Sequence, residues 1–134
     1  MIFKMTPAGQ LTVLHNFTNI DGNHPYGPII QASDGNFYGT TRFGGSSGYG
    51  VVYKITPAGK YTVLHNFTFV DGAGPVAGLV QATDGKFYGA TWAGSSGGKL
   101  YRITSAGGLT YSILHPFTTT TGQSPFVSLF QNTN

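Results

Sequence analysis

The chain has 134 residues with a formal net charge of +3, and only 8% of the residues are charged. Its seven Lys and Arg are dispersed with no two adjacent, which argues against nucleic acid or an anionic membrane as a partner, because both require clustered positive charge. Cysteine is absent, which excludes a disulfide framework, a thiolate metal site and a cysteine nucleophile.

A segment of about fifty residues recurs along the chain. Residues 12–18 (TVLHNFT) return unchanged at 62–68 and in altered form (SILHPFT) at 112–118, an offset of 50 residues each time. The same offset relates Pro25, Pro75 and Pro125, and also Gln31, Gln81 and Gln131. A fixed period of this length is the signature of a repeat architecture, in which each copy forms one structural unit.

The first predicted elements are two strands, at residues 2–5 and 11–17. They correspond to the third and fourth strands of a four-stranded unit, so residues 1–23 form a partial unit. The 21 glycines and the 14% aromatic content suit such a turn-rich all-β chain better than a helical or disordered one.

Two complete units are predicted next, over residues 24–73 and 74–123. In the second unit the strands are expected at 78–82, 87–91, 100–103 and 111–115. An Asp-Gly pair separates the first two strands of each complete unit, which is a strong hairpin signal because glycine accepts the positive φ of a tight turn. Residues 124–134 then supply the first strand of a further unit, at 126–131.

Several strands carry apolar residues on both faces and therefore require cover on both sides. Units stacked face to face around an axis supply that cover. Gly39 and Gly89 lie inside the second strand of their units, where glycine weakens a strand unless another backbone must approach closely. We expect crowding of the backbone near the axis at these two positions.

The repeated motifs F/Y-K-I/M-T-P-A-G, L-H-N-F, D-G and F-Y-G-T/A-T resemble the GloVer-type tandem repeat of bacterial secreted and surface-anchored proteins. The resemblance covers essentially the whole chain. It implies a propeller-like repeat domain within longer exported polypeptides, usually of unassigned activity. It also implies a secreted or cell-surface location, although residues 1–5 lack the apolar core of a signal peptide and no apolar run is long enough to span a membrane.

The predicted fold class is therefore all-β, with β-propeller-type four-stranded antiparallel blades. Propellers usually close with four to eight blades, and closure removes exposed sheet edges. Two full blades with partial blades at both ends do not close a ring alone. Either flanking repeats of a longer chain complete it, or copies of the chain associate head to tail as a homo-oligomer.

His15, His65 and His115 recur at one repeat position and raise the alternative of a ring of metal ligands. Each lies between apolar residues on a strand of a different blade. We expect a structural role instead, in which an imidazole nitrogen bonds a backbone carbonyl, because buried polar groups find partners. The sequence predicts no metal and no cofactor.

The acidic residues are Asp21, Asp34, Asp71 and Asp84, and each precedes a glycine. Turn chemistry accounts for all four, because Asp caps its own turn. The opposed carboxylates of a glycosidase and the closely spaced oxygen ligands of a calcium loop are not evident, although the loops at Asp21 and Asp71 leave weak calcium binding open. We assign no catalytic residue.

The loops after the second strands differ most between repeats, and they carry the candidate ligand-binding residues. These are Arg42, Phe43 and Tyr49 in one copy, Trp92 in the other, and His24, the one histidine outside the repeated set. Aromatic and Arg side chains beside Gly-rich loops suit a glycan or a peptide through stacking and planar hydrogen bonding. Packing between blades is the competing interpretation.

The function expected from these observations is that of a non-catalytic propeller module of an exported bacterial protein, which binds carbohydrate or protein through its loops. A purely structural or assembly repeat without a ligand is the first alternative. A hydrolase or lyase whose site is completed by other chains is the second, since fold alone does not assign function.

Overall fold

The computed structural model describes residues 1–105, 109–122, 124–126 and 129–132, and it confirms an all-β fold of antiparallel sheets. A hairpin is formed by β1 (Ile2–Met5) and β2 (Leu11–His15). The first four-stranded sheet contains β3 (Ile30–Gln31), β4 (Phe37–Thr41), β5 (Val51–Ile55) and β6 (Tyr61–Asn66). The second contains β7 (Val80–Gln81), β8 (Phe87–Thr91), β9 (Lys99–Thr104) and β10 (Thr110–Pro116).

Each four-stranded sheet is a meander in which every strand pairs with the next one along the chain. The first strand has 2 residues in both sheets, whereas the fourth has 6 residues in one and 7 in the other. The Asp-Gly pairs form the predicted tight turns, with Gly35 and Gly85 at φ 78° and 77°. No helix that could cross a membrane occurs among the described residues.

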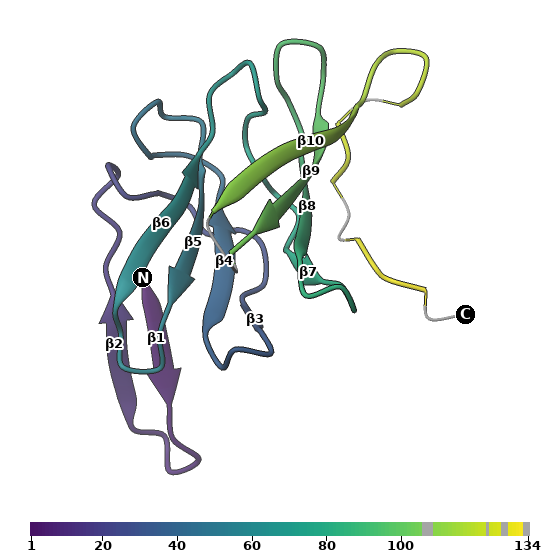
Figure 1. Cartoon of the computed structure of the whole chain (residues 1–134). Coiled ribbons are helices and arrows are strands. Elements are labelled where there is room, and N and C mark those ends of the chain that lie inside the picture. Colours follow the sequence, from purple (N-terminus) through teal and green to yellow (C-terminus); the bar gives the residue numbers. More distant parts are fainter. Residues whose placement is uncertain (106–108, 123, 127–128, 133–134) are drawn as a thin grey trace.

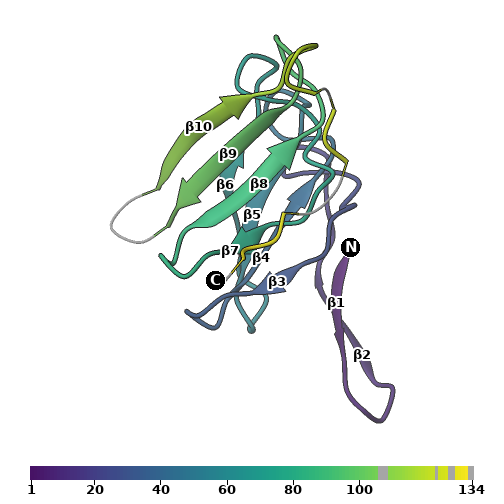
Figure 2. The same cartoon turned by 90° about the vertical axis from the view of Figure 1, so that its right-hand side faces the viewer.

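The hairpin and the two sheets stack face to face in the order of the sequence (Figures 1 and 2). β5 is covered on both faces, as its apolar pattern predicted. Val51, Tyr53 and Ile55 point to the hairpin and pack with Ile2, Leu14 and Phe17. Tyr38, Val52 and Phe67 point the other way and pack with Phe87, Tyr101 and Ile103 of the second sheet.

Gly39 and Gly89 are required by an aromatic side chain on the neighbouring strand. Gly39 pairs with Tyr53 and Gly89 with Tyr101, and a Cβ at either glycine would overlap the phenol of its partner. The expectation that a second backbone crowds these positions is therefore wrong. The tyrosine ring lies over the glycine and fills the space that a side chain would otherwise take.

Residues 126–131, predicted as a first strand, are only partly described, and positions 126 and 129–131 are not in a strand. The segment nevertheless repeats one contact of its predecessor. Gln81 accepts a hydrogen bond from the Ser33 amide and donates one to the Ser33 hydroxyl. Gln131 makes the same two bonds to Thr83, so the third repeat begins to dock on the second as the second docks on the first.

Gly39→Ala should lower the free energy of unfolding by about 1–3 kcal/mol, because the new methyl group forces Tyr53 out of its packed position. Denaturant titration measures the loss. In the Tyr53→Ala background the same glycine substitution should cost nothing further, since the overlap is gone. An equal cost in both backgrounds would show that Tyr53 is not the reason for the glycine.

Candidate functional site

The recurring histidines belong to a contact that joins one repeat to the next. His65 on β6 donates a hydrogen bond from Nε2 to Oδ2 of Asp71, at 3.1 Å. The ring of Tyr111, from the following repeat, stacks on the imidazole with 3.9 Å between centroids and 1° between planes. The Tyr111 hydroxyl donates to the Asp71 carbonyl oxygen, at 2.8 Å. We call this His, Asp and Tyr arrangement the inter-repeat clamp.

The same clamp occurs one repeat earlier. His15 Nε2 lies 3.0 Å from Asp21 Oδ2, and the Tyr61 ring stacks on His15 with 3.8 Å between centroids. The Tyr61 hydroxyl donates to the Asp21 carbonyl oxygen, at 2.6 Å. A structural role fits both histidines. At His65 the predicted backbone-carbonyl partner is wrong, because the partner is the Asp71 carboxylate. His15 Nε2 is buried and close to Asp21, but its geometry does not form a hydrogen bond.

The third copy lacks one component of the clamp. Thr121 stands at the position of Asp71, and its hydroxyl accepts a hydrogen bond from the Thr118 amide, as Asp71 accepts one from Thr68. His115 is exposed there. Among the described residues, no three His, Asp or Glu side chains gather in the manner of metal ligands.

Burial and hydrogen bonding shift the pKa values within the clamps. Burial lowers the pKa of His65 below its ordinary value of 6.5, and the attraction of the Asp71 carboxylate offsets this only in part. For Asp21, burial raises the carboxyl pKa, but the Thr18 hydrogen bonds together with His15 outweigh it and hold the pKa below 3.8. At neutral pH the clamp of His65 and Asp71 therefore joins a neutral imidazole to a carboxylate acceptor.

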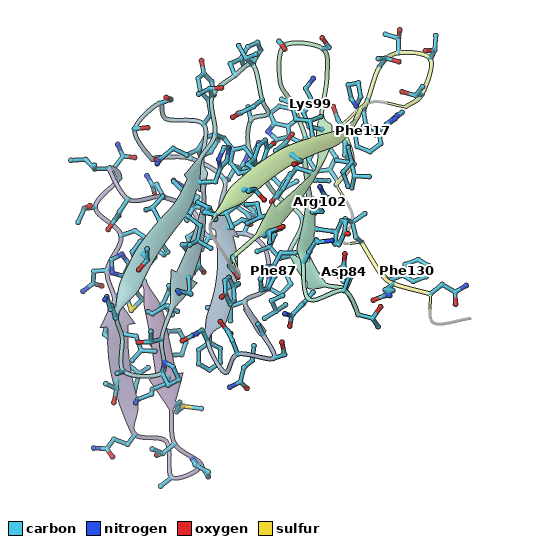
Figure 3. All side chains as sticks on the ribbon, in the orientation of Figure 1. Asp84, Phe87, Lys99, Arg102, Phe117 and Phe130 are labelled. Atoms are coloured by element: carbon cyan, nitrogen blue, oxygen red, sulfur yellow. The ribbon has the colours of Figure 1, made fainter. Side chains whose placement is uncertain are left out.

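Asp34 and Asp84 hold the hairpin turns at the other end of the sheets, as predicted. Asp34 accepts hydrogen bonds from the Asn36 amide and the Tyr38 hydroxyl, and Asp84 accepts the equivalent pair from Lys86 and Tyr88. Figure 3 shows Asp84 at the lower end of the second sheet. The upper end, where Lys99 begins β9, carries the loops with the candidate ligand-binding residues.

Four of the five candidate residues meet at this upper end. The guanidinium carbon of Arg42 lies 5.0 Å from the centroid of the Phe43 ring and 5.3 Å from that of Trp92. His24 contacts Phe43 edge to face, with 5.6 Å between centroids. Tyr49 does not join them and packs on Phe69 instead, at 5.5 Å.

Two further aromatic residues belong to the same surface and were missed in the sequence. Tyr26 lies 5.5 Å from the Arg42 guanidinium carbon, and Phe126 lies 6.0 Å from the Trp92 ring. The result is a row of side chains in the order Tyr26, Arg42, Trp92, Phe126, which we call the aromatic row. Tyr26 and Phe126 are both 63% exposed. Their common repeat position was the available signal.

The row is built by equivalent positions of successive repeats. Arg42 directly follows β4 and Trp92 directly follows β8. Their backbone amides donate to the carbonyl oxygens of His24, at 2.9 Å, and Gly74, at 3.3 Å. In each repeat, the backbone of the residue after the second strand is therefore hydrogen-bonded to the segment that precedes the first strand.

The residue six positions before the first strand and the residue directly after the second strand are sterically coupled. His24, Gly74 and Ser124 occupy one repeat position and have φ of 54°, 60° and 53°. A Cβ at Gly74 would overlap the Trp92 indole, whereas His24 has a side chain beside the slimmer Arg42. Trp92 thus requires glycine at position 74. In the repeat that has Arg42 instead of Trp, His24 adopts the same strained φ with a side chain present.

The two ends of the aromatic row, Tyr26 and Phe126, are exposed, whereas Arg42 and Trp92 between them are half-buried. Cavities of about 230 to 300 Å³ lie elsewhere, beside the hairpin, between the two sheets and under the C-terminal segment. The one between the sheets is lined by Asp34, Tyr38, Lys54 and Gln81 among others. Its carboxylate is already engaged by the turn and by Tyr38.

The half-buried His65 should make stability depend on pH below neutrality. Its pKa is lower in the folded than in the unfolded chain, so the unfolded state binds the proton first as pH falls through 6.5. The free energy of unfolding should fall from pH 7.5 to 5.5, by at most about 1.4 kcal/mol per pH unit. His65→Gln should flatten this dependence. The same slope in His65→Gln would assign the dependence to another group.

Comparison with known proteins gives one result. Neither the curated proteins nor the solved structures with which the chain was compared gave a match. The family model described as Gloeobacter/Verrucomicrobia repeat matches residues 1–134, which confirms the resemblance inferred from the motifs. The chain belongs to the Gloeobacter/Verrucomicrobia repeat family.

Proposed function

We propose that the chain is a non-catalytic β-propeller module of an exported bacterial protein and that it binds carbohydrate through the aromatic row. Three properties of the fold support a propeller. Each complete repeat is a four-stranded meander, its first strand is much shorter than its fourth, and consecutive sheets stack face to face. Short inner strands and longer outer strands suit sheets arranged around a central channel. The exported location is motivated by the resemblance to repeats of secreted and surface-anchored bacterial proteins.

The aromatic row is the observation that carries the binding proposal. It places three rings and one guanidinium side by side on a surface shared by three repeats. Aromatic rings offer flat apolar faces for the C–H faces of sugars, and a guanidinium offers planar hydrogen-bond donors for their oxygens. Because the row extends over several side chains and its two end rings are exposed, it suits a segment of a polymer better than a small molecule. A protein ligand is the alternative that the same residue types allow.

A hydrolase or lyase is the less favoured alternative. The cavity between the sheets contains Asp34, whose hydrogen bonds from Asn36 and Tyr38 outweigh its burial and lower its pKa. The general acid of a glycosidase needs a raised pKa, so the environment of Asp34 shifts it in the opposite direction.

Binding should be lost when the row loses its central ring. On a panel of immobilised oligosaccharides and polysaccharides, Trp92→Ala should weaken binding about tenfold, the equivalent of about 1.4 kcal/mol. Phe130→Ala is the matched control, because Phe130 is 88% exposed and lies beside the lower end of the second sheet, level with Asp84 and away from the upper loops (Figure 3). Retention of no saccharide by the folded chain, or equal loss in both variants, would refute the proposal.

We also propose that the outer face of the hairpin is covered by a further repeat of the same type, supplied by a second copy when the chain is alone. Phe3, Met5, Leu11 and Val13 form this face and are 43 to 64% exposed. Their counterparts one repeat later, Tyr53, Ile55, Tyr61 and Val63, are packed against the preceding unit. At the opposite side of the stack, Leu114 and Phe117 stand where Leu64 and Phe67 contact the second sheet. The two outer faces are therefore the two sides of the internal interface.

Sedimentation velocity tests this second proposal between about 1 and 50 μM, a range around typical weak-to-moderate affinities. The chain should associate as its concentration rises. Phe3→Lys with Val13→Lys, which places two charges on paired positions of the hairpin face, should yield a monomer. Ile20→Lys, in an exposed loop, should not. A wild-type chain that is monomeric throughout contradicts the proposal.

A further inference from the structure

We propose that Arg42 and the rings around it form a subsite for the anionic group of an acidic saccharide. We call Arg42 with Tyr26, Phe43 and Trp92 the Arg42 cage. The inference rests on the proposed function, since it names the class of carbohydrate that the aromatic row accepts. The anionic group is a carboxylate or a sulfate, because a guanidinium fork binds both kinds of oxygen acceptor.

Arg42 has no acidic partner among the residues that the structure describes. Asp21 and Asp71 are engaged by the Thr18 and Thr68 amides and by the clamp histidines. Asp34 and Asp84 hold the turns at the opposite end of the sheets. None of the four Asp residues of the sequence forms an ion pair with Arg42. The charge of Arg42 is therefore available to a ligand.

The guanidinium also retains hydrogen-bonding capacity. Its Nε atom is buried and has no hydrogen-bond partner among the described residues. The terminal N–H groups of this half-buried side chain remain able to donate to a ligand oxygen at the surface. An ionised acceptor gives the stronger bond.

The rings of Tyr26, Phe43 and Trp92 hold the Arg42 guanidinium in position. They lie 5.0 to 5.5 Å from the guanidinium carbon, within the range of cation–π attraction. They cover the cation with apolar surface, which limits its hydration and restricts its rotamers. A pyranose that lies on the exposed Tyr26 ring brings a ring substituent toward the guanidinium, so stacking and charge pairing act on one sugar residue.

The next repeat carries Trp92 at the position of Arg42. The row therefore has one charged position followed by apolar ones, Trp92 and Phe126. A saccharide with one anionic sugar followed by neutral sugars matches this pattern. A saccharide that is anionic on every sugar would place further charges over the indole of Trp92. Short acidic oligosaccharides and polymers with spaced acidic residues are the predicted ligands.

Isothermal titration with defined probes tests the inference. The probes are a hyaluronan oligosaccharide, which carries a carboxylate on every second sugar, its methyl ester, a keratan sulfate oligosaccharide sulfated on every second sugar, and neutral cello-oligosaccharides. One of the two anionic probes should bind at least tenfold more tightly than the neutral ones, and 0.5 M NaCl should reduce this difference. The methyl ester, which keeps the sugar ring and removes the charge, distinguishes carboxylate recognition from recognition of the ring.

Arg42→Gln should weaken binding of the preferred anionic probe about ten- to hundredfold. Arg42→Lys should restore part of it, because the charge remains and the planar fork is lost. Arg102→Gln is the matched control, since it removes the same charge from the middle of β9, below the loops (Figure 3). Near-UV circular dichroism shows whether each variant keeps its aromatic packing.

Each outcome decides between the two proposals. Equal binding of neutral and anionic probes, with no effect of Arg42→Gln and a loss in Trp92→Ala, overturns the acidic subsite and leaves carbohydrate binding intact. An equal effect of Arg42→Gln and Arg102→Gln assigns the preference to net charge and also overturns the subsite. Failure of every probe, neutral and anionic, refutes the proposed function and the inference with it.

Discussion

Contact between the faces of successive sheets is the constraint on which the rest of the structure depends. A four-stranded sheet with apolar residues on both faces is not stable by itself, and β5 shows this directly because Val51 and Val52 are fully buried on opposite sides. Aromatic rings fill the space between the sheets, and the rings of Tyr53 and Tyr101 lie over Gly39 and Gly89. Stability therefore resides between the repeats as much as within them, as expected for a repeat protein.

The inter-repeat clamp adds direction to this packing. Apolar contact alone tolerates sliding between sheets, whereas the clamp fixes a stacked pair of rings and a tyrosine hydroxyl on one carbonyl oxygen. The histidine and aspartate come from one repeat and the tyrosine from the next, so loss of either neighbour leaves polar groups without partners. The Gln81 and Gln131 contacts serve the same purpose at the other end of the sheets.

The sequence predicted those parts of the molecule that depend on neighbours along the chain. The strands, the Asp-Gly turns and the cover on both faces of β5 follow from local patterns and the fifty-residue period. The clamp was not predictable in the same way, because Tyr61 and Tyr111 meet histidines of the previous repeat. For the candidate site, the sequence pointed to Arg42, Phe43, Trp92 and His24, which do meet. It missed Tyr26 and Phe126, whose role depends on how the repeats stack.

The coupling between the residue six positions before the first strand and the residue directly after the second strand has a consequence for how such a surface diversifies. Gly74 accompanies Trp92 because the indole occupies the place of a Cβ, and one repeat earlier, where Arg42 replaces the Trp, His24 has a side chain at the same φ. The variable unit of the surface is thus a pair of positions eighteen residues apart, such as 24 with 42. An engineered array that exchanges both members together retains its framework while acquiring a new chemical preference, one repeat at a time.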